Sequence, residues 1–311
     1  MTLTPRLALL MTLPPLLWAG NAVVGRLMAG QVPPLTLNWM RWLLTVLILL
    51  PLAWRALRPL SRITQRWPYL LAVGVLGVGA FNSLQYLALV TSSPLNVTLV
   101  AASMPVWMLA GGALFFGERA TRRQLLGAVF GLAGVCTVIG RGSLATLLQV
   151  RFVPGDLYIL LAVIGWAFYS WLLARPPAHM RPPQRPDWDW AGFLLVQALF
   201  GLGAASLFTA GEQALGAATI QWSWGVAAAL LYVSLGASIA AYRCWGLGVA
   251  QGGPALAAFF NNLTPLLAAL LSTLVLGEPP QAYHALAFGL IVTGWSWIRR
   301  GFEARAANEE L

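Results

Sequence analysis

The sequence contains no lysine, so all 19 of its basic residues are arginine. A Walker A loop ends in Gly-Lys followed by Ser or Thr, and such a loop cannot be built without lysine. A Schiff base to pyridoxal phosphate also needs a lysine amine. The chain therefore does not cradle ATP in the Walker manner and does not carry pyridoxal phosphate on a lysine.

Charge of either sign is scarce as well. Only 9% of the 311 residues are charged, whereas a soluble domain has about 25%. Apolar residues make up 59% of the chain, and its mean hydropathy is +0.74. So few charges cannot cover a surface that faces water, so we expect most of this protein to face lipid.

Residue types that bind metals or attack substrates are rare. The two cysteines, Cys136 and Cys244, lie within apolar runs, and the two histidines, His179 and His284, are far apart in the sequence. No spacing resembles a metal site or a disulfide framework. The sequence also lacks the His-Glu-x-x-His and Gly-x-Ser-x-Gly motifs. We therefore expect no metal, no cofactor and no catalytic residue, and we predict that the chain is not an enzyme.

Apolar segments long enough to cross a bilayer recur along the whole chain. A spanning helix needs about 20 mostly apolar residues. Read against charges, proline and glycine, the sequence predicts an all-α integral membrane fold with ten transmembrane helices. The predicted spans are 7–28, 34–54, 68–89, 94–117, 122–140, 155–174, 190–210, 222–246, 253–276 and 282–298.

The distribution of arginine predicts the orientation, because cytoplasmic loops are enriched in basic residues. If both termini are cytoplasmic, 15 arginines fall on the cytoplasmic side. Three fall on the opposite side, namely Arg26, Arg141 and Arg151, while Arg41 lies inside the second span. This asymmetry predicts cytoplasmic N- and C-termini.

The chain contains an internal repeat. Residues 86–119 align without gaps with residues 246–279, at a constant offset of 160. The informative identities are Pro94 with Pro254, Pro105 with Pro265, Gly117 with Gly277, and Glu118 with Glu278. The predicted units are a five-helix repeat over 1–143, a second over 144–298, and a cytoplasmic tail over 299–311.

An odd number of spans in each repeat inverts the second repeat relative to the first. The arginines agree, since three of them follow Glu118 closely and none follows Glu278. Many secondary transporters use inverted repeats for alternating access, with a site near the midplane where the two halves meet. The sequence therefore predicts two inverted five-helix repeats around a central cavity.

Motifs in both halves carry a resemblance to a known family. They are Leu17-Trp18-Ala19-Gly20-Asn21, Arg41, Pro105 and Gly117-Glu118-Arg119 in the first half, and Trp166-Ala167-Phe168-Tyr169, Pro265 and Gly277-Glu278-Pro279 in the second. Their order resembles the EamA branch of the drug/metabolite transporter superfamily over almost the whole chain.

The resemblance implies a multi-pass protein of the bacterial inner membrane that exports amino acids or other metabolites. In the aromatic amino acid exporters of this group, helices one, three, four, six, eight and nine surround a central cavity. The family's arginine in the second span is present as Arg41, but the seventh span has no counterpart. Any role of Arg41 is therefore not duplicated.

Polar and aromatic side chains within the spans are candidates to line that cavity, because polar groups in lipid face the bundle interior. The candidates are Trp18, Asn21, Asn82, Gln85, Tyr86, Ser103, Trp107, Trp166, Tyr169, Ser238, Tyr242, Asn261 and Asn262. Hydrogen bonding between helices is an alternative explanation for the serines and asparagines. The interfacial belt is an alternative explanation for aromatic residues near helix ends.

Three charges and two prolines have predicted roles as well. Arg41 is a structural or gate charge that snorkels or bonds helix-end carbonyls, or it binds a substrate carboxylate. Glu118 and Glu278 follow helix C-termini, where the dipole disfavours an anion, so each needs a cationic partner. Nearby arginines are available in sequence only to Glu118. Pro105 and Pro265 are predicted hinges, and a static kink is the alternative.

These patterns predict a secondary transporter that exports small metabolites, such as neutral or aromatic amino acids, by alternating access. A drug or toxic-compound efflux carrier of the same fold is the alternative, and a membrane-embedded enzyme is a weaker one. The expected partners are a small-molecule substrate and the lipid bilayer, with no nucleic acid, in a monomer or homodimer. No span has a mid-membrane Asp, Glu or His, which favours facilitated efflux or, as the alternative, coupling through groups at the helix ends.

Overall fold

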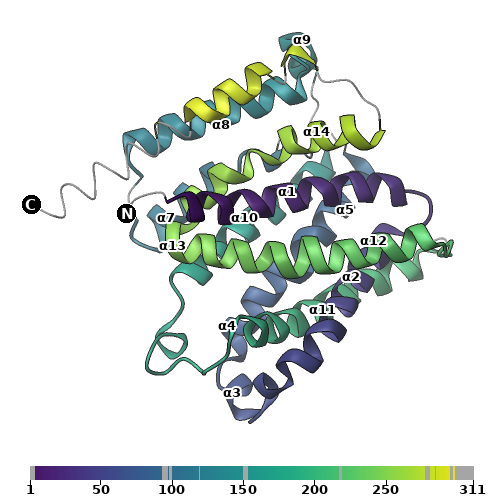
Figure 1. Cartoon of the computed structure of the whole chain (residues 1–311), viewed down its shortest axis with the longest axis vertical. Coiled ribbons are helices and arrows are strands. Elements are labelled where there is room, and N and C mark those ends of the chain that lie inside the picture. The colour runs from purple at the N-terminus through teal and green to yellow at the C-terminus, as the bar shows by residue number, and fades with distance from the viewer. Residues whose placement is uncertain are drawn as a thin grey trace, which may run out of the picture.

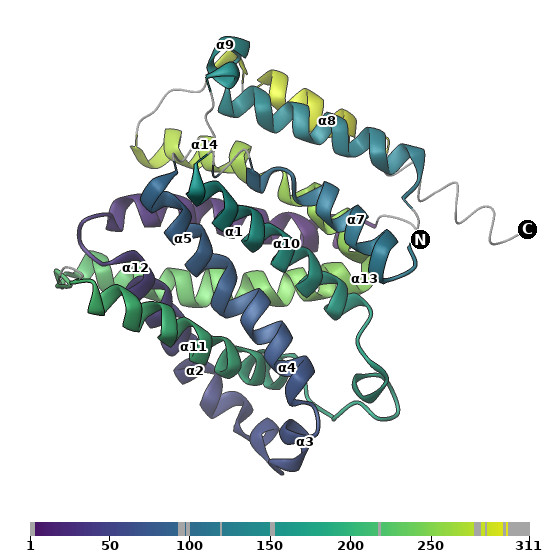
Figure 2. The ribbon, with the colours of Figure 1, turned by 180° about the vertical axis from the view of Figure 1, so that it is seen from behind.

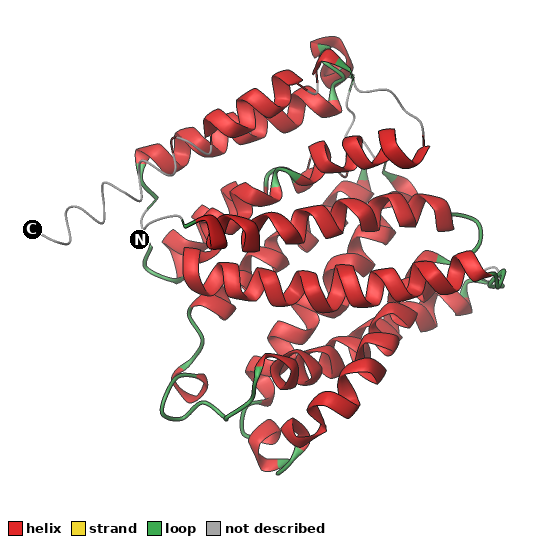
Figure 3. Cartoon of the chain, viewed as in Figure 1, coloured by secondary structure: helices red, strands yellow, loops and turns green. Residues whose placement is uncertain are grey.

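A computed structural model describes residues 4–92, 97, 100–118, 120–149, 153–216, 219–276, 281–283, 285–294 and 297. Every regular element within these residues is helical (Figure 3). Six helical stretches are long and apolar enough to cross a membrane, and Met104–Phe115 and Ala285–Gly294 are shorter apolar helices. The prediction of an all-helical fold with several apolar spans is confirmed.

The elements follow one another with short connections. In chain order they are α1 (Pro5–Met28), α2 (Pro34–Ala53), η1 (Trp54–Leu57), α3 (Ser61–Thr64), α4 (Trp67–Gly74), η2 (Val75–Ala80), α5 (Phe81–Thr91), α7 (Met104–Phe115), α8 (Arg122–Ile139), α9 (Leu144–Leu148), α10 (Pro154–Ala174), η3 (Ala178–Met180), α11 (Trp190–Ala214), α12 (Trp224–Ser234), η4 (Leu235–Ala240), α13 (Ala241–Asn261) and α14 (Thr264–Leu276).

Helices from the two halves of the chain lie side by side. In Figures 1 and 2, α1 runs beside α13 and α14, and α2 runs beside α11. The first-half helices α5 and α7 both pack against α10 of the second half. The centre of the bundle is therefore built jointly by segments that are far apart in the sequence.

Irregular helix geometry recurs at the offset of the sequence repeat. The elements η2 and η4 are π-helices over Val75–Ala80 and Leu235–Ala240, 160 residues apart. Two-residue turns at 102–103 and 262–263, again 160 residues apart, interrupt the helical structure just before α7 and α14. Short π-helical segments inside α-helices are frequent at functional sites. The offset found in the sequence thus extends to the backbone.

The two predicted hinge prolines lie at the starts of helices. Pro105 is the second residue of α7, and Pro265 is the second residue of α14. Proline is tolerated in the first turn because the N–H that it lacks would have no intrahelical partner there. A two-residue turn precedes α7 and another precedes α14, so each proline stands in the first turn of a new helix, and the hinge role stays a prediction.

The predicted boundary between the spans 222–246 and 253–276 coincides with a kink. Helical structure continues from α12 through η4 and α13, but Gly253 inside α13 has φ 79° and ψ 159°. Glycine reaches positive φ at little cost, because it has no Cβ. The chain therefore changes from one helical segment to the next at this residue.

Close packing of α11 against α4 and η2 depends on glycine. A Cβ added at Gly201 would lie 2.2 Å from the Cβ of Val78 and 2.7 Å from the carbonyl oxygen of Gly74. Small residues let membrane helices approach closely, which strengthens their packing. This contact joins an outer helix of the second half to the π-helix of the first.

Replacing Gly201 with alanine is expected to lower the melting temperature of the detergent-purified protein. The added methyl group forces the two helices apart, at a cost of about 1–3 kcal/mol. Gly203 on the same helix has nothing within 4 Å of an added Cβ, so G203A is the matched control and should leave the melting temperature unchanged or raise it. Equal shifts in the two variants would contradict the tight contact.

Candidate functional site

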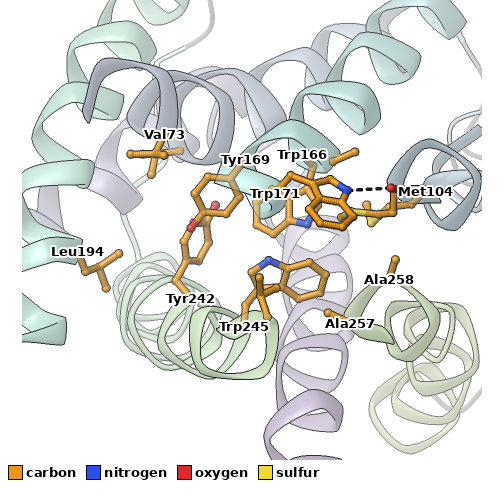
Figure 4. Packing of buried hydrophobic residues seen from close by; sticks show 14 of the residues in the cluster. Val73, Met104, Trp166, Tyr169, Trp171, Leu194, Tyr242, Trp245, Ala257 and Ala258 are labelled. Atoms are coloured by element: carbon orange, nitrogen blue, oxygen red, sulfur yellow. Dashed lines mark hydrogen bonds between the residues drawn. The ribbon is translucent and has the colours of Figure 1, made fainter. Parts of the chain in front are cut away.

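Aromatic side chains from both halves meet in the middle of the bundle. We call them the central aromatic cluster: Trp18 of α1, Trp42 of α2, Phe81 of α5, Trp166 and Tyr169 of α10, and Tyr242 and Trp245 of α13. The Trp166 ring touches most of the others; its centroid lies 4.9 Å from that of Phe81 and 5.3 Å from that of Trp18. Figure 4 shows Trp166, Tyr169, Tyr242 and Trp245 gathered together.

Each π-helix is bound by an aromatic side chain from the other half. The hydroxyl of Tyr242 donates to the carbonyl of Gly77 in η2. The indole of Trp18 donates to the carbonyl of Ala237 in η4 at 3.1 Å. Gly77 and Ala237 are 160 residues apart and so occupy equivalent positions in the repeat. The cluster therefore holds the two irregular segments together across the boundary between the halves.

The polar atoms of the cluster are only partly satisfied. Trp245 donates to the hydroxyl of Ser170 at 3.2 Å. By contrast, the indole nitrogens of Trp42 and Trp166 have no hydrogen-bond partner among the described residues. A buried N–H without an acceptor costs about 1–3 kcal/mol. Trp166 is 2% exposed, so its indole N–H is left without an acceptor amid the other rings.

Candidates on α1 and α5 extend from the cluster along the same helices. Asn21 lies three residues after Trp18, and Gln85 lies four residues after Phe81, so each shares a helix face with a cluster member. Both are half-buried, and so is Tyr86, whereas Asn82 is buried.

The cavity candidates near the turns at 102–103 and 262–263 do not all face the same neighbours. Trp107 donates to the hydroxyl of Ser103 at 3.0 Å, and the Asn261 amide lies 3.6 Å from the sulfur of Met104, which links the two breaks. Asn262 faces α8 instead, because its amide nitrogen would lie 2.5 Å from a Cβ on Gly131. The side chains of Asn261 and Asn262 therefore point to different neighbours, and the cavity role of each stays a prediction.

Arg41 is buried rather than snorkelled, with 3% of its surface exposed. Its Nε donates to the hydroxyl of Ser238 at 2.5 Å, and its Nη2 donates to the carbonyl of Ala237 at 2.8 Å. Ser234 donates in turn to the backbone carbonyl of Arg41 at 3.0 Å. The guanidinium is therefore bound to η4, next to the carbonyl that also accepts from Trp18.

Glu118 pairs with an arginine of the other half. The carboxylate of Glu118 forms an ion pair with Arg175, which follows α10 and lies 57 positions away. The sequence pointed instead to the arginines that follow Glu118. Nearby, the Phe116 and Trp171 rings stack at 5.2 Å, so α7 and α10 are joined at this end. Glu278 lies outside the described residues.

Besides Asp189, which caps α11, two carboxylates that the sequence did not single out bind helix N-termini. The oxygens of Glu212 accept from the backbone N–H groups of Leu35 at 2.9 Å and Thr36 at 2.7 Å, at the start of α2. Asp156 accepts from the backbone N–H of Val153 at 2.7 Å and caps its own helix, α10. Of these two contacts, only that of Asp156 could have been predicted from neighbouring residues, because Val153 is three positions away whereas Leu35 is 177 positions from Glu212.

Glu212 is expected to stabilise the α2–α11 pair. An anion at a helix N-terminus contributes about 0.3–1 kcal/mol through the dipole, with its hydrogen bonds in addition. Glu212→Ala should therefore lower the melting temperature. Gln213→Ala removes one bond, the 2.9 Å contact to the hydroxyl of Thr36, and should lower it less. A larger shift for Gln213→Ala would contradict the capping role.

Comparison with known proteins identifies the class. Residues 6–140 and 153–300 each match the EamA-like transporter family. The two matches cover most of the chain, which therefore belongs to that family of membrane transporters. The resemblance seen in the motifs is thereby confirmed.

Among the described residues, no group of three His, Cys, Asp or Glu side chains could hold a metal ion.

Several relatives are named as transporters. The uncharacterized transporter YyaM of Bacillus subtilis is 26% identical over 72% of this chain and 70% of its own. The aromatic amino acid exporter YddG of Ancylobacter novellus is 26% identical over 76% of this chain and 77% of its own. A probable amino-acid metabolite efflux pump of Salmonella typhimurium is 26% identical over 93% of each chain.

Among the solved structures that match this chain is a crystal structure with the same fold. It superposes with a TM-score of 0.75, covers 96% of this chain and 99% of its own, and is 23% identical in sequence. At that identity the likeness concerns the fold alone.

Proposed function

We propose that this protein is a secondary transporter of the bacterial inner membrane that exports small metabolites such as neutral or aromatic amino acids. The observation that carries the proposal is the central aromatic cluster, where rings from α1, α5, α10 and α13 meet. Membership of the EamA-like family supports transport itself.

The proposed architecture has ten transmembrane helices in two inverted repeats, 1–143 and 144–298, with both termini and the tail 299–311 in the cytoplasm. The arginine asymmetry supports this orientation. The two π-helices and the two helix breaks, each pair 160 residues apart, support the repeat. An odd number of helices in each repeat makes the second the inverse of the first.

Alternating access is the proposed mechanism. The contacts of Tyr242 with Gly77 and of Trp18 with Ala237 hold the halves together at the centre. The breaks before α7 and α14 leave the outer parts of those helices able to tilt about the centre. The Glu118–Arg175 ion pair and the Phe116–Trp171 stack close one end and would separate when that end opens.

The chemistry of the cluster points to an apolar or aromatic solute with a hydrogen-bond acceptor. Aromatic pairs contribute about 0.5–1.5 kcal/mol beyond the area that they bury, and the Trp166 indole offers a free donor. The names of two relatives, an aromatic amino acid exporter and a probable amino-acid metabolite efflux pump, support the same substrate class. A cationic drug is the second candidate, because the same rings can bind cations.

Uptake by proteoliposomes tests the proposal. Labelled phenylalanine, tyrosine, tryptophan and leucine, and separately a fluorescent organic cation, are offered to liposomes with and without the protein. We expect at least one amino acid to equilibrate faster with the protein than without it. Movement of the cation alone would favour the drug carrier, and movement of neither class would contradict the proposal.

A further inference from the structure

Arg41 is a charge buried in the middle of the protein. It is the eighth residue of α2, and only 3% of its surface is exposed. Removing a cation from water costs several kcal/mol unless a partner of opposite charge and further hydrogen bonds compensate. An ionisable residue inside a membrane span is therefore a candidate for function, and its counter-charge needs to be identified.

No described carboxylate supplies that counter-charge. Each of the five binds elsewhere: Glu118 to Arg175, Asp187 to Arg62, Asp189 to the N-terminus of α11, Asp156 to that of α10, and Glu212 to that of α2. The polar neighbours of Arg41 are neutral, namely Ser238, the carbonyl of Ala237, and the phenols of Tyr86, Tyr232 and Tyr242 within electrostatic range. Its charge thus has no carboxylate partner in the described part of the chain, and the ring nearest to it is that of Trp42, whose centroid lies 5.2 Å from the guanidinium carbon.

A purely structural role does not account for the charge. Arg41 uses one N–H on Nε and one on Nη2 to bind η4. A neutral side chain with two donors could make two such bonds without burying a cation. Gln197, the eighth residue of α11, is a buried neutral side chain of this kind, and its amide donates one hydrogen bond, to the hydroxyl of Tyr169 at 3.0 Å.

Arg41 lies next to the central aromatic cluster. The carbonyl of Ala237 accepts both from Arg41 and from Trp18, whose ring lies 5.3 Å from that of Trp166. The guanidinium has five N–H donors in a planar fork that matches a carboxylate. The bonds to η4 use one donor on Nε and one on Nη2.

We propose that Arg41 binds the carboxylate of the transported solute while the central aromatic cluster holds its apolar or aromatic body. The inference rests on the proposed function and narrows it to solutes that combine a carboxylate with an apolar body. The solute then supplies the missing counter-charge. An amine with the same ring and no carboxylate would instead place a second cation near Arg41, so cationic solutes are disfavoured.

Binding to the purified protein tests this independently of transport. Dissociation constants are measured by calorimetry or thermal shift for phenylalanine, 3-phenylpropionate and phenethylamine, which share a ring and differ in charge. Arg41→Gln removes the cation, Arg41→Lys keeps it, and Arg243→Gln is the matched control. Arg243 is exposed on α13, with its guanidinium carbon 4.1 Å from the Trp190 ring centroid.

We expect the wild type and Arg243→Gln to bind the two carboxylates about 10- to 100-fold more tightly than phenethylamine, as for a hydrogen bond to a charged group. Arg41→Gln should lose this preference, and Arg41→Lys should retain part of it. Equal affinities for acid and amine in the wild type, no binding of either, or an unchanged preference in folded Arg41→Gln would overturn the inference. Carboxylate binding without transport would instead contradict the proposed function alone.

Discussion

Replacing Trp166 with phenylalanine is expected to slow transport of an aromatic amino acid by about 10- to 100-fold, the loss that follows from one unreplaced hydrogen bond in a dry site. The Trp166 ring contacts five others, and its indole N–H has no partner among the described residues. Phenylalanine keeps an aromatic ring but has no donor. Initial rates of uptake into proteoliposomes measure the effect.

Two other tryptophans calibrate this prediction. Trp245→Phe removes an N–H that already binds Ser170 within the protein, so we expect a smaller loss of transport. Trp54→Phe changes a residue of η1 that is 46% exposed and lies against Arg55 and Arg58, and it should transport normally. If Trp166→Phe and Trp54→Phe transport equally well, Trp166 does not contact the solute.

Replacing Pro105 or Pro265 with alanine is expected to slow transport about two- to tenfold while solute binding persists. Alanine restores a backbone donor at the second residue of α7 or α14, so the helix can continue through the preceding turn. One added hydrogen bond stabilises the continuous, unbent helix by about 0.5–1.5 kcal/mol, so bending at the turn costs that much more. Transport rate and binding affinity are measured on the same preparations.

The control for the prolines is Pro51→Ala, because Pro51 lies inside the last turns of α2 and is exposed. It should leave the transport rate unchanged. Since the repeats are proposed to be inverted, the two hinge variants should also impair opposite gates, which cysteine labelling from each side of the membrane would reveal. Normal transport in both hinge variants would show that the turns at 102–103 and 262–263 do not bend during transport, and it would contradict the hinge role.

The sequence predicted an all-helical fold with several apolar spans and an inward position for several of the rings that meet in the middle of the bundle. Long apolar windows indicated spanning helices because a helix in lipid satisfies its own backbone, and six helices among the described residues are long and apolar enough to cross a membrane. The helical positions of Trp18, Trp166 and Tyr242 suggested that they face inward, and the structure brings these three rings together. The repeat offset of 160, read from two prolines and a Gly-Glu pair, also relates the π-helices η2 and η4.

Contacts between distant segments could not be predicted in the same way. Periodicity says which face of a helix is polar but not which helix lies opposite. It could not reveal that Arg41 binds Ser238, that Glu118 pairs with Arg175, or that Glu212 caps α2. The π-helices add a residue to a turn and so shift the faces that a regular helix would present. Asn262 faces α8 for a related reason, since the turn before α14 breaks the regular spacing.

The most direct test of an alternating carrier is counterflow. Proteoliposomes are loaded with a high concentration of unlabelled amino acid, and a trace of the labelled compound is added outside. A carrier that exposes one site to each side in turn should accumulate the label transiently above its equilibrium level and more slowly in Trp166→Phe. A channel or an enzyme would produce no overshoot, and a monotonic approach to equilibrium in the wild type would contradict the proposed mechanism.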